Sequence, residues 1–310
     1  MNVSIIIVNY NTTKLLQQCI DSIVKRTKGV SYEIIVVDNH NNEIIVVDNH
    51  SREEEVVPLR QDGRIILLEQ QENLGFGRAN NIGAAHSKGE HLFLLNPDTI
   101  LVNDAITILY EHLKSNPHTG LCGGNIFDSD MRPIHSHDRM PPNLLCELDI
   151  ITRHIYSKLA YGKNSWFNHT QKQMKVALIT GADMMVRRQA WDEVGGFDMS
   201  FFMYFEDSDL CVCIKDKGYD IMNVPDAHII HLEGKSFHES RARVERYFAG
   251  RNVFFRKHYS LLYNKITDGI NICSFRAGVT LFRLLGKEQR ADIYQQRLEV
   301  YKDICRQNKQ

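Results

Sequence analysis

Short apolar runs alternate with amphipathic stretches along the first 125 residues of the chain. The runs are rich in Ile, Val and Leu and predict buried strands, whereas the stretches between them repeat their apolar positions at helical spacing. Strands are expected at residues 3–8, 33–37, 65–68 and 91–95, and helices at residues 13–27 and 77–87. This alternation indicates an α/β fold with a mostly parallel central sheet. Ligands of such sheets bind beyond the carboxyl ends of the strands, so the loops that contain Asn9, Asp38, Asn73 and Asn96 should converge on one crevice.

The next part of the chain is less regular. Residues 128–175 contain clustered Pro, His and Asn, and we expect them to form a mobile loop over an acceptor site. Farther on, an aromatic stretch precedes Glu206 and Asp207, which should open a helix. Residues 227–231 alternate in a way that predicts the end of a strand, with His231 as its last residue.

The C-terminal residues are helical and basic. The first helix interleaves aromatic side chains with cations, namely Arg241, Arg243, Arg246, Arg251, Arg256 and Lys257. Such a helix can rest on anionic lipid, or it can pack against the protein with its arginines in solvent. We therefore expect one α/β domain over residues 1–238 and a C-terminal helical extension over residues 239–310.

Composition narrows the class of protein. The 37 Lys and Arg residues balance 38 Asp and Glu, so no overall charge points to a nucleic acid as partner. Seven cysteines form no CxxC pair and no zinc-type spacing, which favours reduced thiols in a cytoplasmic protein. The chain starts without a signal-peptide pattern and contains no apolar run of about 18 residues. We expect a cytoplasmic protein, compatible with a peripheral position on the inner face of a membrane.

An eight-residue segment occurs twice inside the predicted sheet, with a period of ten residues. Residues 33–40 are repeated without change as residues 43–50. Two copies do not make a repeat architecture, so the pattern indicates a local tandem duplication. One copy should form the strand, and the other an extra edge strand or a bulged loop. The sequence does not distinguish the two aspartates, Asp38 and Asp48, as the one that faces a ligand.

Several short motifs occur in a fixed order along residues 1–260. Each is weak alone, but the ordered set resembles the family 2 glycosyltransferases with a GT-A fold, most of all the bacterial rhamnosyltransferase-type branch. The motifs are Val8-Asn9-Tyr10-Asn11, the duplicated Val-Val-Asp-Asn, Asn73-Leu74-Gly75-Phe76-Gly77, Leu95-Asn96-Pro97-Asp98-Thr99, Gly195-Gly196-Phe197-Asp198, Glu206-Asp207-Ser208-Asp209-Leu210 and His231. The resemblance implies a nucleotide-sugar half at residues 1–125 and an acceptor half at residues 126–238.

The resemblance also implies which residues hold the nucleotide. Asn9 and Asn11 of the first loop, with Asp38 or Asp48, would bind the base and ribose. Along the sequence, Asp38 has the family's usual spacing from the first strand, and Asp48 has the usual spacing to Asn73. A ten-residue insertion would produce this split.

The glycine-rich motif should contact the donor diphosphate. Its spacing is not GxGxxG and it does not follow the first strand, which argues against a Rossmann dehydrogenase. Its glycines would let backbone approach the donor, and a helix N-terminus can accept phosphate. The candidate contacts are Asn73, Gly75, Arg78 and Asn80. A glycine-rich cap of a surface helix is the alternative interpretation.

A metal site is implied by Asn96-Pro97-Asp98, which stands where the family commonly has Asp-x-Asp. Asp98 would be the carboxylate ligand, and Asn96 a weaker neutral partner. A departing nucleoside diphosphate builds up negative charge that Mg²⁺ or Mn²⁺ on hard oxygen ligands neutralises. His231 is expected as the second ligand, with His228 and His238 as fallbacks. Taken alone, Asn-Pro-Asp is also an ordinary turn, and a lone histidine at a strand end is often structural.

The catalytic base is expected in the helix that begins at Glu206. By resemblance Asp207 is the base, and Glu206 and Asp209 position the acceptor or the loop. An aspartate in a first helical turn is favoured by the helix dipole and should stay ionised. Acids placed there only to cap the helix are the alternative. Second-rank candidates for the sugar pocket are Gly181, Ala182 and Asp198. Cys213 stands where relatives often carry an arginine, and Lys215 is a candidate replacement.

Together these features predict an inverting, metal-dependent glycosyltransferase. It would move a sugar, with rhamnose as the best candidate, from a nucleoside diphosphate to a hydroxyl of a glycan or lipid-linked saccharide in cell-surface polysaccharide synthesis. Two alternatives remain at this point. One is a catalytically impaired sugar-nucleotide-binding subunit, suggested by the duplication. The other is a metal-dependent nucleotidyltransferase, which would want a basic glycine-rich loop where Asn9-Tyr10-Asn11 stands.

Overall fold

The computed structural model describes residues 1–32, 44–232 and 240–307. Among these residues, nine strands form one mixed sheet in the order β3-β2-β1-β4-β10-β6-β11-β5, with β8 beside β11. The strands of this sheet are β1 (Val3–Asn9), β2 (Ile44–Asp48), β3 (Ile66–Glu69), β4 (His91–Leu95), β5 (Thr99–Leu101), β6 (Thr119–Phe127), β8 (Met174–Lys175), β10 (Asp183–Arg187) and β11 (Asp220–His231). A small second sheet pairs β7 (His137–Asp138) with β9 (Leu178–Ile179). Strands β1 to β4 run parallel, as expected, and β10 and β5 run antiparallel to their neighbours.

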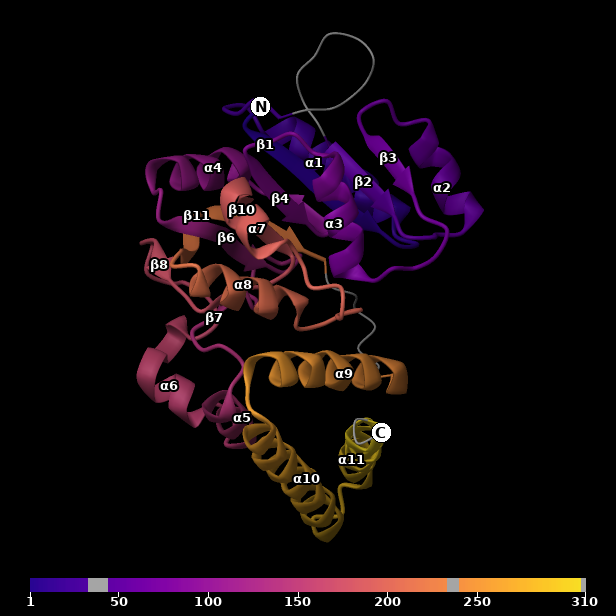
Figure 1. Ribbon diagram of the computed structural model, residues 1–310, viewed down its shortest axis with the longest axis vertical. Coiled ribbons are helices and arrows are strands. Elements are labelled where there is room, and N and C mark those ends of the chain that lie inside the picture. Colours follow the sequence, from indigo (N-terminus) through magenta and orange to yellow (C-terminus); the bar gives the residue numbers. More distant parts are fainter. Residues whose placement is uncertain (33–43, 233–239, 308–310) are drawn as a thin grey trace.

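Helices cover both faces of the sheet because the central strands are apolar on both sides (Figure 1). Ile5 and Ile7 of β1 pack in one core with α1 and α4, whereas Ile6 and Val8 pack in the other with α3, α7 and α8. Burying each such side chain contributes about 1.5–3 kcal/mol. The covering helices are α1 (Thr13–Arg26), α2 (Glu53–Arg60), α3 (Phe76–His86), α4 (Ala105–Ser115), α7 (Arg188–Val194) and α8 (Glu206–Asp216).

The second copy of the duplicated segment forms β2. Ile44 pairs with Ile5 of β1, and upstream of the duplication Tyr32 forms a bridge with Val3. Tyr32 and Ile44 are twelve residues apart in the chain, but their partners on β1 are only two apart. The excess of ten equals the length of the repeat, so the strand would be continuous without it. The first copy, including Asp38, lies outside the described residues.

Five helices form the lower part of the molecule (Figure 1). They are α5 (Leu144–Ile151), α6 (Ile155–Tyr161), α9 (Arg241–His258), α10 (Leu261–Leu284) and α11 (Glu288–Gln307). The last three share an aromatic core around Phe248, Phe275 and Tyr301. None of the helices in the described ranges is long and apolar enough to cross a bilayer.

The interpretation of residues 128–175 as an irregular loop was wrong in part. This segment contains α5 and α6, followed by a 3-10 turn at Gly162–Asn164. The Asn143 side chain caps α5 by accepting a hydrogen bond from the Cys146 amide. Both helices are short, so they offer too few turns for a clear helical period in the sequence.

Candidate active site

Asp98 and His231 meet at one edge of the sheet. β5 follows Asp98 directly and pairs antiparallel with the end of β11, so that Thr99 lies opposite His231. His231 Nε2 is 3.1 Å from Asp98 Oδ1, and Asn96 Nδ2 is 3.4 Å from the same ring nitrogen. The structure therefore brings together the two expected metal ligands and their neutral neighbour. His228, the fallback, packs against Phe127 instead, and His238 lies outside the described residues.

The chemistry of this pair suits a divalent cation. A carboxylate oxygen and an imidazole nitrogen are ligands for Mn²⁺ and Mg²⁺. The two atoms lie within hydrogen-bond distance of each other, so one bound cation would have both ligands at hand. Both side chains remain partly exposed, at 10% for His231 and 23% for Asp98, so other coordination positions would stay open.

Asn9 and Asp48 join the first two strand-end loops. Asn9 Nδ2 donates to Asp48 Oδ1 at 2.9 Å, and the Ser51 amide donates to Asp48 Oδ2. Asn11 accepts a hydrogen bond from the Arg52 amide, while its own amide donates to Ser51 Oγ. Ser51 thus bonds to residues of both loops, a role that sequence reasoning missed. Asn9 and Asp48 are almost fully buried, so in the structure they fix the two loops to each other.

Asn73 belongs to the same network through Asn49. Asn49 Nδ2 donates to Asn73 Oδ1 at 2.9 Å and to the Gly75 carbonyl at 3.2 Å. Gly75 has φ +82°, and an added Cβ would lie 2.0 Å from the Phe202 carbonyl oxygen. In the structure the tight contact of this glycine is with the segment that leads into α8. Close approach of a donor stays a prediction.

Arg78 and Asn80 do not reach the site. Arg78 donates from Nε and Nη2 to the Met199 carbonyl, and Asn80 is buried and donates to the Phe76 carbonyl. Both were expected to contact the diphosphate or ribose. Both side chains bond to backbone carbonyls of the protein. The presence of polar residues in a first helical turn does not reveal in which direction they point.

A cavity of about 930 Å³ extends from Asn96 and His231 to the expected base, Asp207. Its lining includes Asn96, His231, Glu206, Asp207 and residues of α5 and α6. Asp207 is oriented by two backbone donors, because Oδ2 accepts from the Gly181 amide at 3.0 Å and Oδ1 from the Ser208 amide at 2.7 Å. Gly181 was a second-rank candidate, and its contact to Asp207 gives it a place at the site.

Burial changes the expected electrostatics of the two acids. It raises the pKa of Asp207 above that of an exposed aspartate, against the expectation of an ordinary first-turn carboxylate. Burial and the neighbouring Asp207 charge raise the pKa of Glu206 to about 8. Glu206 Oε2 is buried with no hydrogen-bond partner among the described residues. Such an orphaned group in a cavity wall is available to a bound molecule.

The backbone that presents these acids is strained. Tyr204 and Phe205, immediately before α8, have φ values of +70° and +69°. Non-glycine residues rarely adopt this region, and they persist there when surrounding packing enforces it, often at functional sites. Phe205 is held by aromatic contacts with Tyr247 and Phe254 of α9.

Comparison with known proteins identifies the family of this chain. Residues 4–195 match the family model described as Glycosyl transferase family 2. The chain belongs to this family. Relatives include the Rhamnosyltransferase WbbL of Escherichia coli K12, 27% identical over 183 residues, which cover 56% of this chain and 66% of that protein. An N-acetylglucosaminyl-diphospho-decaprenol L-rhamnosyltransferase of Mycobacterium tuberculosis H37Rv is 29% identical, over 55% of this chain and 59% of that protein.

Other relatives are much longer than this family 2 chain. An uncharacterized protein of Sinorhizobium fredii, y4gI, is 26% identical over 79% of this chain but only 26% of its own length. The chain thus spans about two thirds of these relatives' length at most.

Solved structures confirm the GT-A fold. The mannosyltransferase PcManGT of Pyrobaculum calidifontis, in complex with GDP-Man and Mn²⁺, has a TM-score of 0.58 at 16% identity, over 98% of this chain and 85% of that one. GalNAc-T7 with UDP, GalNAc and Mn²⁺ has a TM-score of 0.57 at 16% identity, over 82% of this chain and 50% of that one.

A lysine of α9 holds two acids near the start of α8. Lys257 of α9 contacts Asp209 at 2.8 Å and Asp198 at 2.7 Å, whereas Lys215 is exposed. Although partial burial opposes it, the hydrogen bonds from Lys257 and Ser200 lower the pKa of Asp198 to about 2. Sequence reasoning missed Lys257 because its partners lie 48 and 59 residues away.

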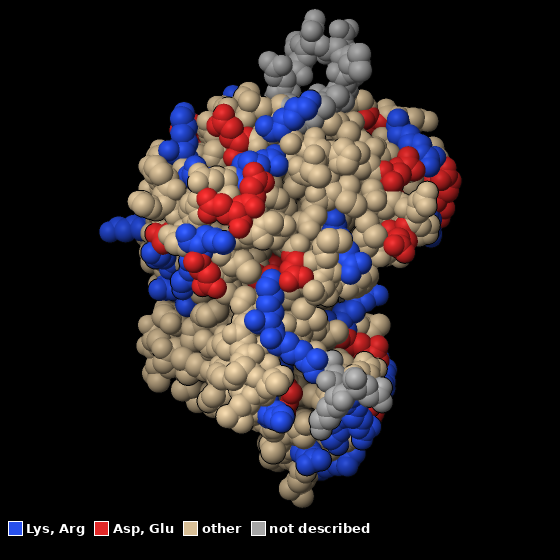
Figure 2. All heavy atoms as spheres, in the orientation of Figure 1, with Lys and Arg blue, Asp and Glu red and all other residues tan. Residues whose placement is uncertain are grey.

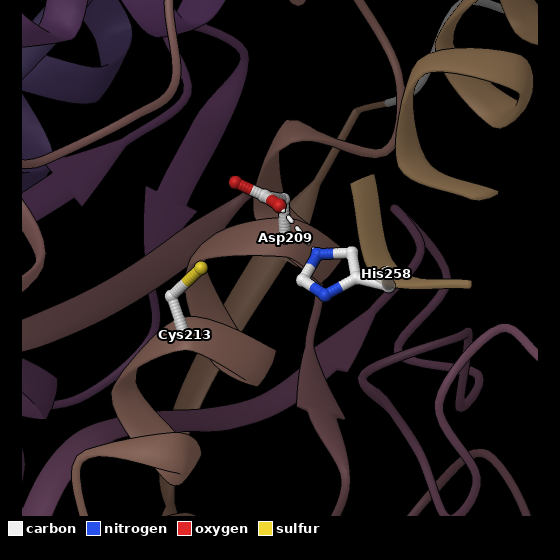
Figure 3. Close-up of side chains that lie close together, drawn as sticks. All are labelled: Asp209, Cys213 and His258. Atoms are coloured by element: carbon white, nitrogen blue, oxygen red, sulfur yellow. Dashed lines mark hydrogen bonds and ion pairs between the residues drawn. The ribbon is translucent and has the colours of Figure 1, made fainter. Parts of the chain in front are cut away.

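Asp209 also accepts a hydrogen bond from His258, 2.7 Å away, and Cys213 lies close to both (Figure 3). These three residue types are metal ligands in many proteins. Here the Lys257 ammonium already lies against the Asp209 carboxylate, which disfavours a second cation. The cluster instead fastens α8, which carries Asp207, to the C-terminal helices.

Proposed function

We propose that the chain transfers a sugar, with inversion, from a nucleoside diphosphate to a hydroxyl of an acceptor. The observation that carries the proposal is the single cavity in which His231 and Asn96 line one part and Asp207 another. A donor diphosphate held near Asp98 and His231 would present its anomeric carbon within the same space as an acceptor near Asp207.

A divalent ion would be held by Asp98 and His231, with Asn96 beside them. When bound, it supplies positive charge that stabilises the departing diphosphate. At the other end of the nucleotide, we assign the base and ribose to the loops that Asn9, Asn11 and Asp48 hold together. Asn73 positions the adjoining turn through Asn49.

Asp207 acts as the base in this proposal. The acceptor oxygen forms a bond to the anomeric carbon, the bond from that carbon to the diphosphate oxygen breaks, and the acceptor proton passes to Asp207. The raised pKa of Asp207 makes it a better proton acceptor than an exposed aspartate. Protonated Glu206 would donate a hydrogen bond to the acceptor through its otherwise unpartnered carboxyl group.

Rhamnose is the sugar that the relatives favour, and a lipid-linked saccharide is the acceptor. Two relatives carry rhamnosyltransferase in their names, and one of these names an acceptor with a diphospho-decaprenol group. We propose a deoxythymidine or uridine diphosphate donor and a role in cell-surface polysaccharide synthesis. Contact with a membrane through the C-terminal helices fits such an acceptor.

The duplication no longer supports the alternative of an impaired binding subunit. That alternative was suggested by the duplication in the strand that precedes Asp48, but β2 is in parallel register with β1, and Asp48 contacts Asn9. The loop after β1 reads Asn9-Tyr10-Asn11 and lacks the basic glycine-rich sequence that a nucleotidyltransferase would want.

The test combines donor binding with turnover. Calorimetric titration of deoxythymidine and uridine diphosphates, with and without Mn²⁺, should show metal-dependent binding. Asp207→Asn should keep this binding but lower sugar transfer by about 100- to 10,000-fold. Asp216→Asn, at the exposed far end of the same helix, is the matched control and should retain activity. Pyrophosphate release, or metal-dependent binding without turnover in the unmodified protein, would contradict the proposal.

A further inference from the structure

The longest helix of the structure exposes an apolar stripe. At 3.6 residues per turn, seven positions of α10 fall within an arc of about 100°. They are Leu262, Ile266, Ile270, Cys273, Ala277, Leu281 and Leu284. Leu262 is 68% exposed and Leu284 is 81% exposed, at opposite ends of the stripe. The face that packs on the protein is a different one, centred on Asn271, Phe275 and Val279.

A row of cations borders this stripe. Lys265, Arg276 and Arg283 fall together on one flank of α10, between the apolar stripe and the buried face. The only acid of this fully described helix, Asp268, is turned inward, where it contacts Arg251 and Tyr301. An exposed apolar face with a basic edge is the pattern of a helix that lies in a membrane interface.

α5 and α6 continue the same kind of surface. Leu145, Leu148, Ile155 and Leu159 are exposed, and Leu159 reaches 83%. In Figure 2, the surface over α5 and α6 is almost entirely tan. α5 is fixed to α10, because the Tyr263 hydroxyl accepts from the Leu144 amide and Asn271 donates to Glu147.

The two acids of α5 also lie away from this exposed apolar surface. Glu147 is paired with buried Arg251, and Asp149 is 2% exposed and bonded to Ser157. Every exposed charged residue of these three fully described helices is therefore a cation, although the whole chain has a net charge of −1. The list is Lys158, Lys265, Arg276 and Arg283.

We propose that α5, α6 and α10 form a surface, here called the lipid face, that lies on a bilayer with anionic head groups. Leucine and isoleucine side chains enter the interface, and the cations contact lipid phosphates. A second copy of the chain is a poorer occupant, since a two-fold contact through α10 would bring its cations against the same cations of the partner. The Arg-rich α9 is not the contact: Arg251 is buried and Arg241 pairs with Glu245.

The lipid face borders the candidate active site. Ile150, His154 and Lys158 of α5 and α6 line the cavity that also contains Asp207. This step rests on the proposed function: an acceptor whose lipid tail stays in the bilayer would enter the cavity between these helices and reach the base. Lipid binding itself is independent of that function and is measured separately.

Vesicle flotation tests the lipid face with the full chain. The protein should float with vesicles of phosphatidylcholine and phosphatidylglycerol, less with phosphatidylcholine alone, and less at high salt. The double variant Leu262→Glu/Ile266→Glu should lower vesicle affinity at least about tenfold. The matched control is Val24→Glu, 43% exposed on α1 at the opposite end of the molecule, which should float normally (Figure 1). Lys265→Gln/Arg276→Gln/Arg283→Gln should remove the preference for anionic vesicles.

Three outcomes would overturn the lipid face. One is no flotation of the unmodified protein with anionic vesicles. The second is equal loss in Val24→Glu and in the α10 double variant. The third is a dimer in light scattering that Leu262→Glu/Ile266→Glu converts to a monomer while vesicle binding is unchanged. Transfer to a short, water-soluble acceptor should be the same in all these variants. An unmodified protein that transfers sugar but does not float with anionic vesicles would refute the lipid face alone. Flotation without any transfer would refute the proposed function alone.

Discussion

Asp98 and His231 are 133 residues apart in the chain, yet their side chains lie 3.1 Å apart because β5 and β11 pair antiparallel. The Leu232 amide also donates to the Asp98 carbonyl at 2.8 Å, so the backbone fixes the pair as well as the side chains. A ligand pair built on paired strands keeps its geometry better than one built on loops.

Metal-dependent donor binding should depend on this pair. Asp98→Asn and His231→Ala are each expected to weaken Mn²⁺-dependent nucleoside diphosphate binding by at least about tenfold, since a direct ligand should matter no less than its supporting contacts. His228→Ala, on the same strand but packed against Phe127, is the control and should bind normally. Calorimetric titration with and without chelator measures the difference. Equal effects at residues 228 and 231 would reject the assignment.

Stability should fall with rising pH because of Glu206. Its folded-state pKa is raised from an ordinary 4.5 to about 8, so the folded protein holds this proton more tightly than the unfolded chain. The resulting stabilisation is complete below pH ~4.5 and is lost as the pH rises toward 8. Glu206→Gln cannot ionise, so its melting temperature should fall less over this range than that of the unmodified protein. Glu111→Gln, on the exposed side of α4, is the control for thermal melts at several pH values.

Transfer activity should have an acidic limb at higher pH than an exposed aspartate would give. Asp207 must be ionised to accept the acceptor proton, and burial raises its pKa. kcat/KM should therefore fall as the pH drops through that raised value. A rate profile on a soluble acceptor measures the limb. A profile that stays flat down to pH 4 would argue against Asp207 as the base.

Gly75→Ala should destabilise the protein by roughly 1–3 kcal/mol from backbone strain alone, because φ +82° with ψ −180° is open only to glycine. The overlap with the Phe202 carbonyl would add to this cost and shift the segment before α8. Gly269→Ala is the matched control: it sits inside α10 with open space around it, and should be neutral or stabilising by up to about 1 kcal/mol. Urea unfolding compares the two.

Excising residues 33–42 should leave fold and donor binding intact. The bridge between Tyr32 and Val3 and the pairing of Ile44 with Ile5 would then join into one uninterrupted strand. We expect an unchanged or higher melting temperature and unchanged nucleotide affinity. A protein that fails to fold after this excision would show that the first copy has a structural role.

The sequence predicts the central strands well because both of their faces are buried, as in the continuous apolar run of β1. It also predicts the ends of these strands, where Asp98 and His231 lie, and the start of α8, where Asp207 lies. It does not predict the direction of side chains on helices. Arg78 and Asn80 were expected at the donor, but in the structure Arg78 donates to the Met199 carbonyl and Asn80 to the Phe76 carbonyl. Nor does it reveal long-range partners such as Lys257 and Asp209, whose meeting depends on how α9 packs.

The pairing of β5 with β11 sets an order of events during synthesis. Asp98 leaves the ribosome long before residues 220–231, so the nascent chain carries one half of the metal pair without the other. A chain that ends before β11 would lack both the imidazole and the strand with which β5 and β6 pair. Under the proposed function, the metal site would be complete only in chains whose translation has passed His231.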